Sequence, residues 1–208
     1  MISKQFFSLL VIIAVISLLG FITENVWISI TKGFMDNRNM YFPFLLGYGL
    51  AVAALFLLFG TPAHPRFLIY ELAIENSIAR SLYYLLMMAL CVSIGEILLG
   101  TLVEKTCGII WWNYTELPLH IGKYTSVPTS LGFATLITIF MRFCFEPLYN
   151  FCLTRSYHVV AILGSSLFIL MLVDFFHSAW YMVKNKRLMQ RWTIDTTGSR
   201  VYQYLHTR

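Results

Sequence analysis

Long apolar runs with almost no charge are the feature that most constrains what this chain can fold into. Residues 39–63 carry no formal charge, and residues 5–31 carry only that of Glu24. A helix needs about 20 mostly apolar residues to cross a bilayer, and only helices or closed barrels satisfy their backbone there. Unbroken runs, instead of ten-residue alternations, favour helices over a barrel. The sequence therefore predicts an all-α, polytopic integral membrane helical bundle.

About five transmembrane helices are expected. Charged residues make up 12% of the chain, about half of the roughly 25% that is usual in soluble domains. We expect one transmembrane helical domain over residues 1–183, followed by a basic tail over 184–208. The expected spans are residues 6–30, 42–60, 81–103, 126–150 and 158–183.

The excess positive charge indicates an orientation. By the positive-inside rule, the basic tail should be cytoplasmic, and five spans across the cell membrane would place the amino terminus outside. If residues 106–122 also crossed, the amino terminus would be inside. Anionic membrane lipid is the partner that this charge favours, and nucleic acid is not expected. The tail carries Lys184, Lys186, Arg187, Arg191, Arg200 and Arg208 against Asp195 alone.

The four cysteines form no close pair with metal-ligand spacing. We therefore expect no metal site and no cofactor.

Ionisable side chains inside the apolar runs are the candidate functional residues, because a charge at bilayer depth is expensive. On the expected topology, Glu24, Glu96 and Asp174 all fall in the inner half of the membrane, where they could converge with polar residues of the two inner connections. The candidate substrate-binding residues are Glu24, Asn37, Arg38, Glu96, Trp111, Trp112, Tyr114, Asp174 and His177.

Helical spacing groups some of these residues. Ser93, Glu96 and Gly100 share one helix face, and Asp174 and His177 lie one turn apart on another. An Asp–His pair could relay protons or bind a metal, although two ligands on one helix are too few to assign one. The structural alternative is packing with mutual hydrogen bonds.

Two ion pairs are predicted. Arg142 and Glu146 have i, i+4 spacing and should pair with each other. Arg38 lies in a short connection between two apolar runs, and its guanidinium should pair with Glu24, with Glu96 or with both. For Glu24 the alternative is snorkelling to the membrane surface.

Residues 106–122 are expected to form a short aromatic inner loop, whose re-entrant or spanning course the sequence leaves open. Its aromatic residues Trp111, Trp112 and Tyr114 could shape a site or form an aromatic belt at the head groups.

Several motifs resemble those of the CmpB-like family of ABC-transporter type IV permeases, which includes the vertebrate transmembrane protein 229 group. The resemblance covers about residues 20–150. The family's aromatic motif usually reads Trp-Asp-Tyr-Ser, whereas this chain has Asn113 and Thr115, which puts in doubt any role that needs a charge at position 113. The similar segments are GFITEN (20–25), DNRNMYFPFLLGYG (36–49), LFGTP (58–62), GEILLG (95–100) and WWNY (111–114). The residues that the resemblance implicates are Glu24, Asn37, Arg38, Glu96, Trp112, Tyr114 and Gly122.

Three functions are compatible with these features. The first is a permease or transporter component for a small or amphipathic substrate, working as a homo-oligomer or with a partner subunit. The chain has no nucleotide-binding motif, so a partner would have to hydrolyse any ATP. The second is an intramembrane enzyme acting on a lipid or isoprenoid, with Glu96 or Glu24 as general acid. The third is a structural or regulatory subunit.

Overall fold

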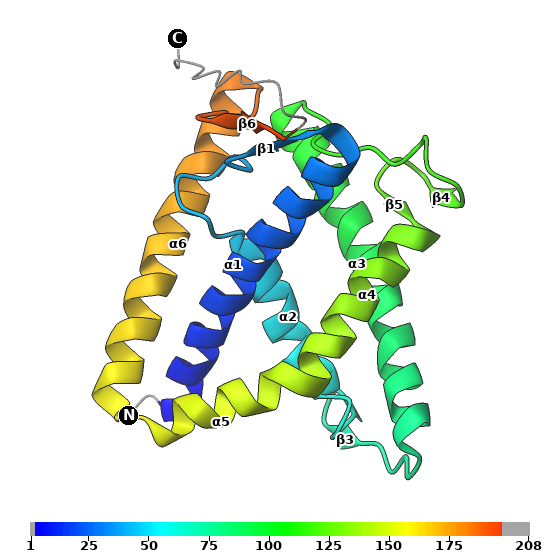
Figure 1. Ribbon diagram of the computed structural model, residues 1–208, viewed down its shortest axis with the longest axis vertical. Helices are drawn as coiled ribbons and strands as arrows, with labels where there is room; N and C mark the ends of the chain where they lie inside the picture. Colours follow the sequence, from blue (N-terminus) through cyan, green and yellow to red (C-terminus); the bar gives the residue numbers. More distant parts are fainter. Residues whose placement is uncertain (1–2, 197–208) are drawn as a thin grey trace. The chain divides into compact units, whose positions relative to one another are not determined.

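The computed structural model describes residues 3–196, which form two compact units (Figure 1). Unit 1 is Met1–Ala53 with Phe151–Arg208, and unit 2 is Ala54–Asn150. The predicted fold class is confirmed, because the described chain is an all-α membrane-type bundle. Four helical stretches are long and apolar enough to cross a membrane: Lys4–Lys32, Ser77–Cys107, Val127–Thr154 and Tyr157–Asn185.

Unit 1 is built on α1 (Lys4–Lys32) and α6 (Tyr157–Asn185), which pack along each other. A Cβ added at Gly164 of α6 would lie 2.8 Å from the Phe7 carbonyl oxygen of α1, so this glycine permits the close approach of the two helices. The buried core of unit 1 contains Leu10, Ile13, Ala14, Leu46, Ala53 and Met171.

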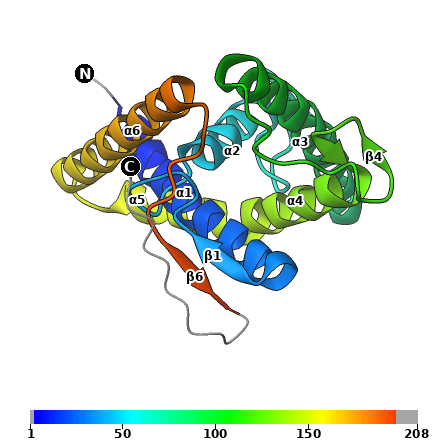
Figure 2. The same ribbon diagram turned by 90° about the horizontal axis from the view of Figure 1, so that it is seen from above.

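The helices α1 and α6 run in the same direction. Near their amino-terminal ends, the rings of Phe7 and Tyr157 are 5.7 Å apart. Beyond their carboxyl ends, β1 (Phe34–Asp36) pairs antiparallel with β6 (Thr193–Asp195), as Figure 2 also shows. Part of the expected basic tail thus folds back onto unit 1, and residues 197–208 of that tail lie outside the described residues.

The helix α2 (Leu46–Phe59) is shorter than the expected span 42–60. Pro43 disfavours a helical conformation at Phe42, the residue before it, and the chain stays non-helical up to Leu45. Fourteen residues extend only about 21 Å at 1.5 Å per residue. Its small residues Gly49 and Ala53 face α1 and the core, in agreement with the small-xxx-small pattern.

Unit 2 is a helical hairpin of α3 (Ser77–Cys107) and α4 (Val127–Phe140), which continues through the π-helical segment η1 (Met141–Phe145) into α5 (Glu146–Thr154). The Asn76 side chain caps the start of α3 and Gly108 ends it in a left-handed conformation. Two short antiparallel hairpins complete the unit, β2 (Arg66–Phe67) with β3 (Tyr70–Glu71), and β4 (His120–Ile121) with β5 (Thr125–Ser126).

The connection between α3 and α4 is a loop. Within it the structure assigns no helix between Gly108 and Ser126, and the chain closes through the β4–β5 hairpin. A spanning course for residues 106–122 would need a helix to satisfy its backbone in lipid. The structure therefore gives no additional helical span over residues 108–126.

Candidate functional site

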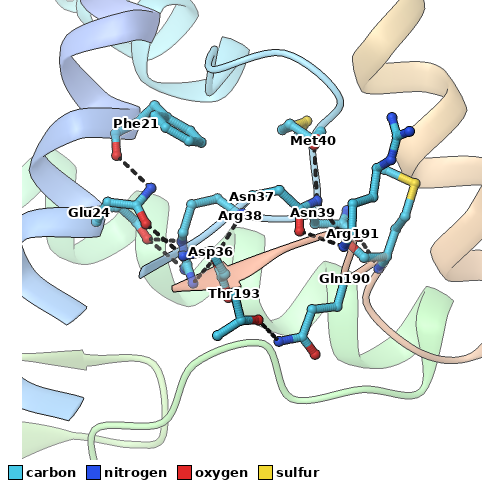
Figure 3. A network of polar contacts seen from close by, with 12 residues as sticks. Phe21, Glu24, Asp36, Asn37, Arg38, Asn39, Met40, Gln190, Arg191 and Thr193 are labelled. Atoms are coloured by element: carbon cyan, nitrogen blue, oxygen red, sulfur yellow. Dashed lines mark hydrogen bonds and ion pairs between the residues drawn. The ribbon is translucent and has the colours of Figure 1, made fainter. Parts of the chain in front are cut away.

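An ion pair between α1 and the segment after it is the centre of the polar site in unit 1 (Figure 3). Arg38 Nη2 and Nε lie 2.6 and 3.0 Å from Glu24 Oε2, and the Tyr48 hydroxyl donates to Glu24 Oε1 at 2.5 Å. The side chains of Arg38 and Glu24 are 15% and 25% exposed. The predicted pairing of Arg38 with Glu24 is confirmed, and protein partners hold Glu24 in place of snorkelling.

Tyr48 is a partner of Glu24 that the sequence did not lead us to expect. A Cβ at Gly20 would lie 2.7 Å from Tyr48 Cγ, so the absence of a side chain at position 20 makes room for this ring against α1. Gly20 and Glu24 are one turn apart on α1 and lie in the GFITEN motif. A glycine one turn before Glu24 indicates space for a large side chain beside this carboxylate, and this is the feature of the sequence that could have pointed to an aromatic partner.

A tight turn presents Arg38 to Glu24. Arg38 and Asn39 have φ angles of +46° and +64°, and the Met40 N–H donates to the Asn37 carbonyl at 2.8 Å, which is the arrangement of a type I′ turn. Asparagine tolerates this left-handed region, but an ordinary side chain such as arginine costs roughly 1 kcal/mol or more there. The Asp36 carboxylate, which accepts from the Arg38 N–H at 2.8 Å, helps to hold the turn.

The two asparagines of this turn bind the segment that follows α6. Asn37 Nδ2 donates to the Met40 and Met189 carbonyls, both at 2.9 Å, and Asn37 Oδ1 accepts from the Arg191 N–H at 2.8 Å. Asn39 Oδ1 accepts from the Met189 N–H at 2.6 Å. The buried Asn37 side chain is therefore a bridge between two distant segments of the chain.

Asp174 holds non-helical backbone beside the middle of α6. It is 5% exposed, and it accepts from the Tyr41 N–H at 2.9 Å and the Phe42 N–H at 2.9 Å. By the 1.5 Å rise per residue, it lies about 16 Å from the carboxyl end of α6. Within a bilayer, the hydrogen-bonding groups of non-helical backbone need partners from protein or water. The Asp174 carboxylate is the partner of two amides that precede α2 and take no part in its helical hydrogen bonds.

His177 has a different environment from Asp174. Its ring is exposed and lies 5.0 Å from the Tyr41 ring and 6.1 Å from the Trp180 ring, centroid to centroid. The Asp174 carboxylate is directed to the backbone of residues 41 and 42 and to the Ser178 hydroxyl at 3.4 Å. The structure thus brings both residues to the same segment, but through separate contacts.

In unit 2, Glu96 lies in a chain of hydroxyl groups between α3 and α4. Thr125 Oγ1 donates to Glu96 Oε2 at 2.7 Å and is 2.8 Å from Ser130 Oγ, to which Ser93 Oγ donates at 2.8 Å. Thr125 is fully buried and Ser130 nearly so. The predicted face of Ser93, Glu96 and Gly100 points toward the start of α4, because Gly100 also contacts the Tyr124 ring.

The aromatic loop after α3 is fastened to residues just before α4. The Trp112 indole N–H donates to the Tyr124 carbonyl at 2.9 Å, and the Tyr114 N–H donates to the Lys123 carbonyl at 2.8 Å. The half-buried Trp111 ring packs against Trp112 at 6.2 Å. These contacts order the loop, so its aromatic side chains keep fixed positions.

Tyr124 connects this loop to the end of α3. Its hydroxyl donates to Glu104 at 2.5 Å, and Glu104 also accepts from Lys123 Nζ at 2.7 Å. Burial and the neighbouring Glu104 carboxylate raise the pKa of Tyr124 to about 12. The phenol therefore stays protonated and remains a donor over the whole physiological pH range.

The departure at Asn113 leaves local structure intact. Asn113 Oδ1 accepts from the Thr115 N–H at 3.0 Å, and this Asx turn is available to asparagine and aspartate alike. The observed contact therefore needs no charge at position 113.

The predicted Arg142–Glu146 pair is wrong. Arg142 donates instead to the Ser81 and Ser77 hydroxyls at 2.7 and 2.8 Å, whereas Glu146 Oε1 accepts from Thr61 Oγ1 at 2.6 Å. The segment η1 between them has i→i+5 hydrogen bonds, which interrupt the α-helical spacing on which the prediction relied.

The candidate residues divide between the two units. The structure directly joins Glu24 with Arg38. It links Asn37 to the segment after α6 and Asp174 to the amides of the segment before α2. Glu96 and the aromatic loop form a second polar cluster, and the convergence of the two sets stays a prediction. Unit 1 holds Glu24, Asn37, Arg38, Asp174 and His177, and unit 2 holds Glu96, Trp111, Trp112 and Tyr114.

Comparison with known proteins gives one result. A family model described as "Putative ABC-transporter type IV" matches residues 11–179. No curated protein and no solved structure matches the chain. The match includes the whole of unit 2 and every candidate residue, and the helices long and apolar enough for a membrane agree with it. The chain therefore belongs to the ABC-transporter type IV (CmpB-like) family of membrane proteins.

Proposed function

We propose that this protein is the membrane-embedded permease component of a transporter. Its substrate path runs beside the non-helical segment 37–45 of unit 1, and its substrate is a small or amphipathic molecule. The single observation that carries this proposal is the bond between Asp174 and the amides of Tyr41 and Phe42. Many secondary transporters build their sites from interrupted helices near the middle of the bilayer.

The Glu24–Arg38 pair is the gate of this path. The left-handed backbone of Arg38 stores strain that the ion pair holds in place. If the two side chains separate, the backbone at Arg38 can relax and its strain is released. At the same time the charge-assisted hydrogen bond between Arg38 and Glu24 is lost. Such opposing terms favour a gate with two states of similar free energy, which transport requires.

The same contacts argue against an intramembrane enzyme. A general acid must present a proton to its substrate, but Glu24 accepts from both Arg38 and Tyr48. Asp174 is likewise occupied by backbone amides. Both carboxylates accept hydrogen bonds that stabilise the surrounding structure. This arrangement supports a gate more than a catalytic centre.

A partner completes the transporter. If transport is driven by ATP, the nucleotide must be hydrolysed by another subunit, because this sequence has no phosphate-binding loop. The helices α3 and α6 expose most of their apolar surface, which a second copy of the chain, a partner subunit or lipid could cover.

Accessibility of position 41 tests the proposal without knowledge of the substrate. In a background in which Cys91, Cys107, Cys144 and Cys152 are replaced by serine, Tyr41→Cys is treated with a membrane-impermeant thiol reagent in right-side-out and inside-out vesicles. A permease that alternates between two states exposes this position to both sides. Ile162→Cys, on the exposed apolar surface of α6, is the control and should not react. Reaction of Tyr41→Cys from one side only, or from neither, overturns the proposal.

A further inference from the structure

Unit 2 contains a cavity of about 240 Å³ that none of the functional assignments above uses. It lies near the start of α3, at the end of that helix opposite to the aromatic loop. Its walls come from α2, from the turn and hairpin that follow α2, and from the junction of η1 with α5. All its lining residues belong to unit 2.

The turn after α2 orients one carboxylate in this cavity. Thr61 Oγ1 donates to Glu146 Oε1 at 2.6 Å, and His64 Nδ1 lies 3.1 Å from the same oxygen. The turn depends on Gly60, whose φ of +71° is left-handed and whose missing Cβ would collide with the His64 carbonyl oxygen. The LFGTP motif thus fixes the position of Glu146, and the second carboxylate oxygen has no partner among the described residues.

Aromatic rings form the apolar wall. Phe145 and Tyr149 stack at 5.9 Å with an angle of 16° between their planes, and the Phe56 ring lies 4.4 Å from that of Phe145. Arg66 already covers Phe56, because its guanidinium lies 5.5 Å from that ring and donates to the Phe56 carbonyl at 2.7 Å. Arg66 therefore acts as part of the wall, and its Nε atom is buried there without a hydrogen-bond partner in the described part of the chain.

Two carboxylates supply the charged acceptors of the cavity. Glu146 contributes its second oxygen, Glu71 contributes an exposed carboxylate, and Tyr149 also lines the space. Two carboxylates against one guanidinium leave the cavity with a net negative charge while His64 is neutral. A primary ammonium carries one positive charge and three N–H donors. We propose that this cavity binds the primary ammonium group of a small amine or of a lipid head group.

This site shares no residue with the proposed transport path, whose residues belong to unit 1. A matched pair of probes tests it. Ethanolamine and choline share one skeleton, but only ethanolamine has N–H donors on its ammonium nitrogen. Binding of each chloride salt to the purified full chain in detergent is measured by saturation-transfer NMR, with sodium chloride at equal ionic strength as the blank.

The variant Glu146→Gln keeps an acceptor for Thr61 but removes the charge, and Glu75→Gln, at an exposed carboxylate outside the cavity, is the control. We expect ethanolamine to bind the wild type and Glu75→Gln equally, and Glu146→Gln at least tenfold more weakly. Equal binding by Glu146→Gln, equal binding of choline, or no binding of ethanolamine would overturn the proposal. Thermal unfolding of each variant without ligand shows whether Glu146→Gln remains folded. Tyr149→Leu, a second variant that leaves the charge of the cavity unchanged, should also weaken binding.

Nanodiscs distinguish the two sources of the amine. Wild-type protein is reconstituted in bilayers of phosphatidylcholine with and without phosphatidylethanolamine, and ethanolamine is titrated into both. If the lipid is the occupant, phosphatidylethanolamine abolishes the binding of free ethanolamine. If the occupant is a soluble amine, both bilayers give the same affinity. Either result supports the site, and loss of ethanolamine binding in both bilayers contradicts it.

Discussion

Arg38 binds Glu24 through two nitrogen atoms at 2.6 and 3.0 Å, even though a left-handed turn must hold the arginine in place. The two residues are 14 positions apart and are joined by the end of α1 and the strand β1. A planar guanidinium suits this carboxylate because its N–H groups form a fixed fork.

Replacement of Arg38 by alanine should destabilise the protein strongly. Removal of one partner from a buried pair costs about 3–5 kcal/mol, and we expect the lower end of this range because Glu24 is partly exposed. The melting temperature in detergent should fall much further for Arg38→Ala than for Lys32→Ala, whose exposed side chain is the control. Arg38→Lys should restore only part of the loss. Equal melting temperatures for the two alanine variants would mean that the pair contributes nothing.

Asp174→Asn should weaken the contact with residues 41 and 42. An amide has one acceptor oxygen in place of two and no charge, and a hydrogen bond to a charged group contributes roughly 1.5–3 kcal/mol. We expect a loss of about 2 kcal/mol in the free energy of unfolding, measured by denaturant titration in mixed micelles. His177→Ala should change it by less than about 0.5 kcal/mol, as is usual for exposed positions. A larger effect for His177→Ala would reverse the roles given to these two residues.

How far the sequence predicts this site depends on the kind of partner involved. The apolar runs define the helices because lipid demands long apolar stretches, and Arg38 finds Glu24 because few counter-ions lie close to it. The bonds of Asp174 are made to backbone amides more than 130 residues away, and every residue carries such an amide, so no pattern of side chains points to them.

The wrong prediction for Arg142 and Glu146 has a related cause. An i, i+4 spacing says that two side chains can meet on a regular α-helix, but it does not exclude better partners elsewhere. Here a π-helical segment interrupts the spacing. Arg142 donates to a hydroxyl group on α3, and Glu146 accepts from a hydroxyl group on the turn after α2. Neither the π-helix nor the proximity of those hydroxyls is encoded in local spacing.

Gly100 and Gly95 form a matched pair on α3. A Cβ at Gly100 would overlap the Tyr124 ring, whereas a Cβ at Gly95 meets no described atom within 4 Å. Gly100→Ala should therefore destabilise unit 2 by about 1–3 kcal/mol through overpacking. Gly95→Ala should leave stability unchanged or raise it by up to about 1 kcal/mol, because alanine favours a helix. Both are measured by thermal unfolding in detergent, and a greater loss for Gly95→Ala would contradict the packing described.

Trp112→Phe should loosen the aromatic loop. Phenylalanine keeps the ring but loses the donor to the Tyr124 carbonyl, which should cost about 1 kcal/mol. Trp111→Phe is the control, because the contact that the structure gives Trp111 is a ring contact. Limited proteolysis of residues 108–126 should be faster in Trp112→Phe than in wild type or Trp111→Phe. Equal rates in all three would show that the indole N–H does not hold the loop.

The direction of α1 and α6 predicts the sides of the two termini. Because these helices are parallel in unit 1, the chain between them must cross the membrane an odd number of times. If the hairpin of α3 and α4 supplies two crossings, α2 with its flanking segments must supply the third. We therefore expect single cysteines at Gln5 and Leu188 to react with an impermeant reagent from opposite sides of sealed vesicles, with Leu188 on the cytoplasmic side as the positive-inside rule predicts. Reaction of both from the same side would mean that α2 does not cross.

The pairing of β1 with β6 has a consequence for the order of synthesis. The Asn37 side chain binds the amide of Arg191, 154 residues later in the chain. At about 5–20 residues per second, this partner leaves the ribosome roughly 8–30 s after Asn37 itself. Unit 2 is already complete once residue 150 has been made, whereas unit 1 at that point still lacks α6 and β6. Translation that stops before α6 would therefore leave α1 without its packing partner, and translation that stops between α6 and β6 would leave β1 without its paired strand.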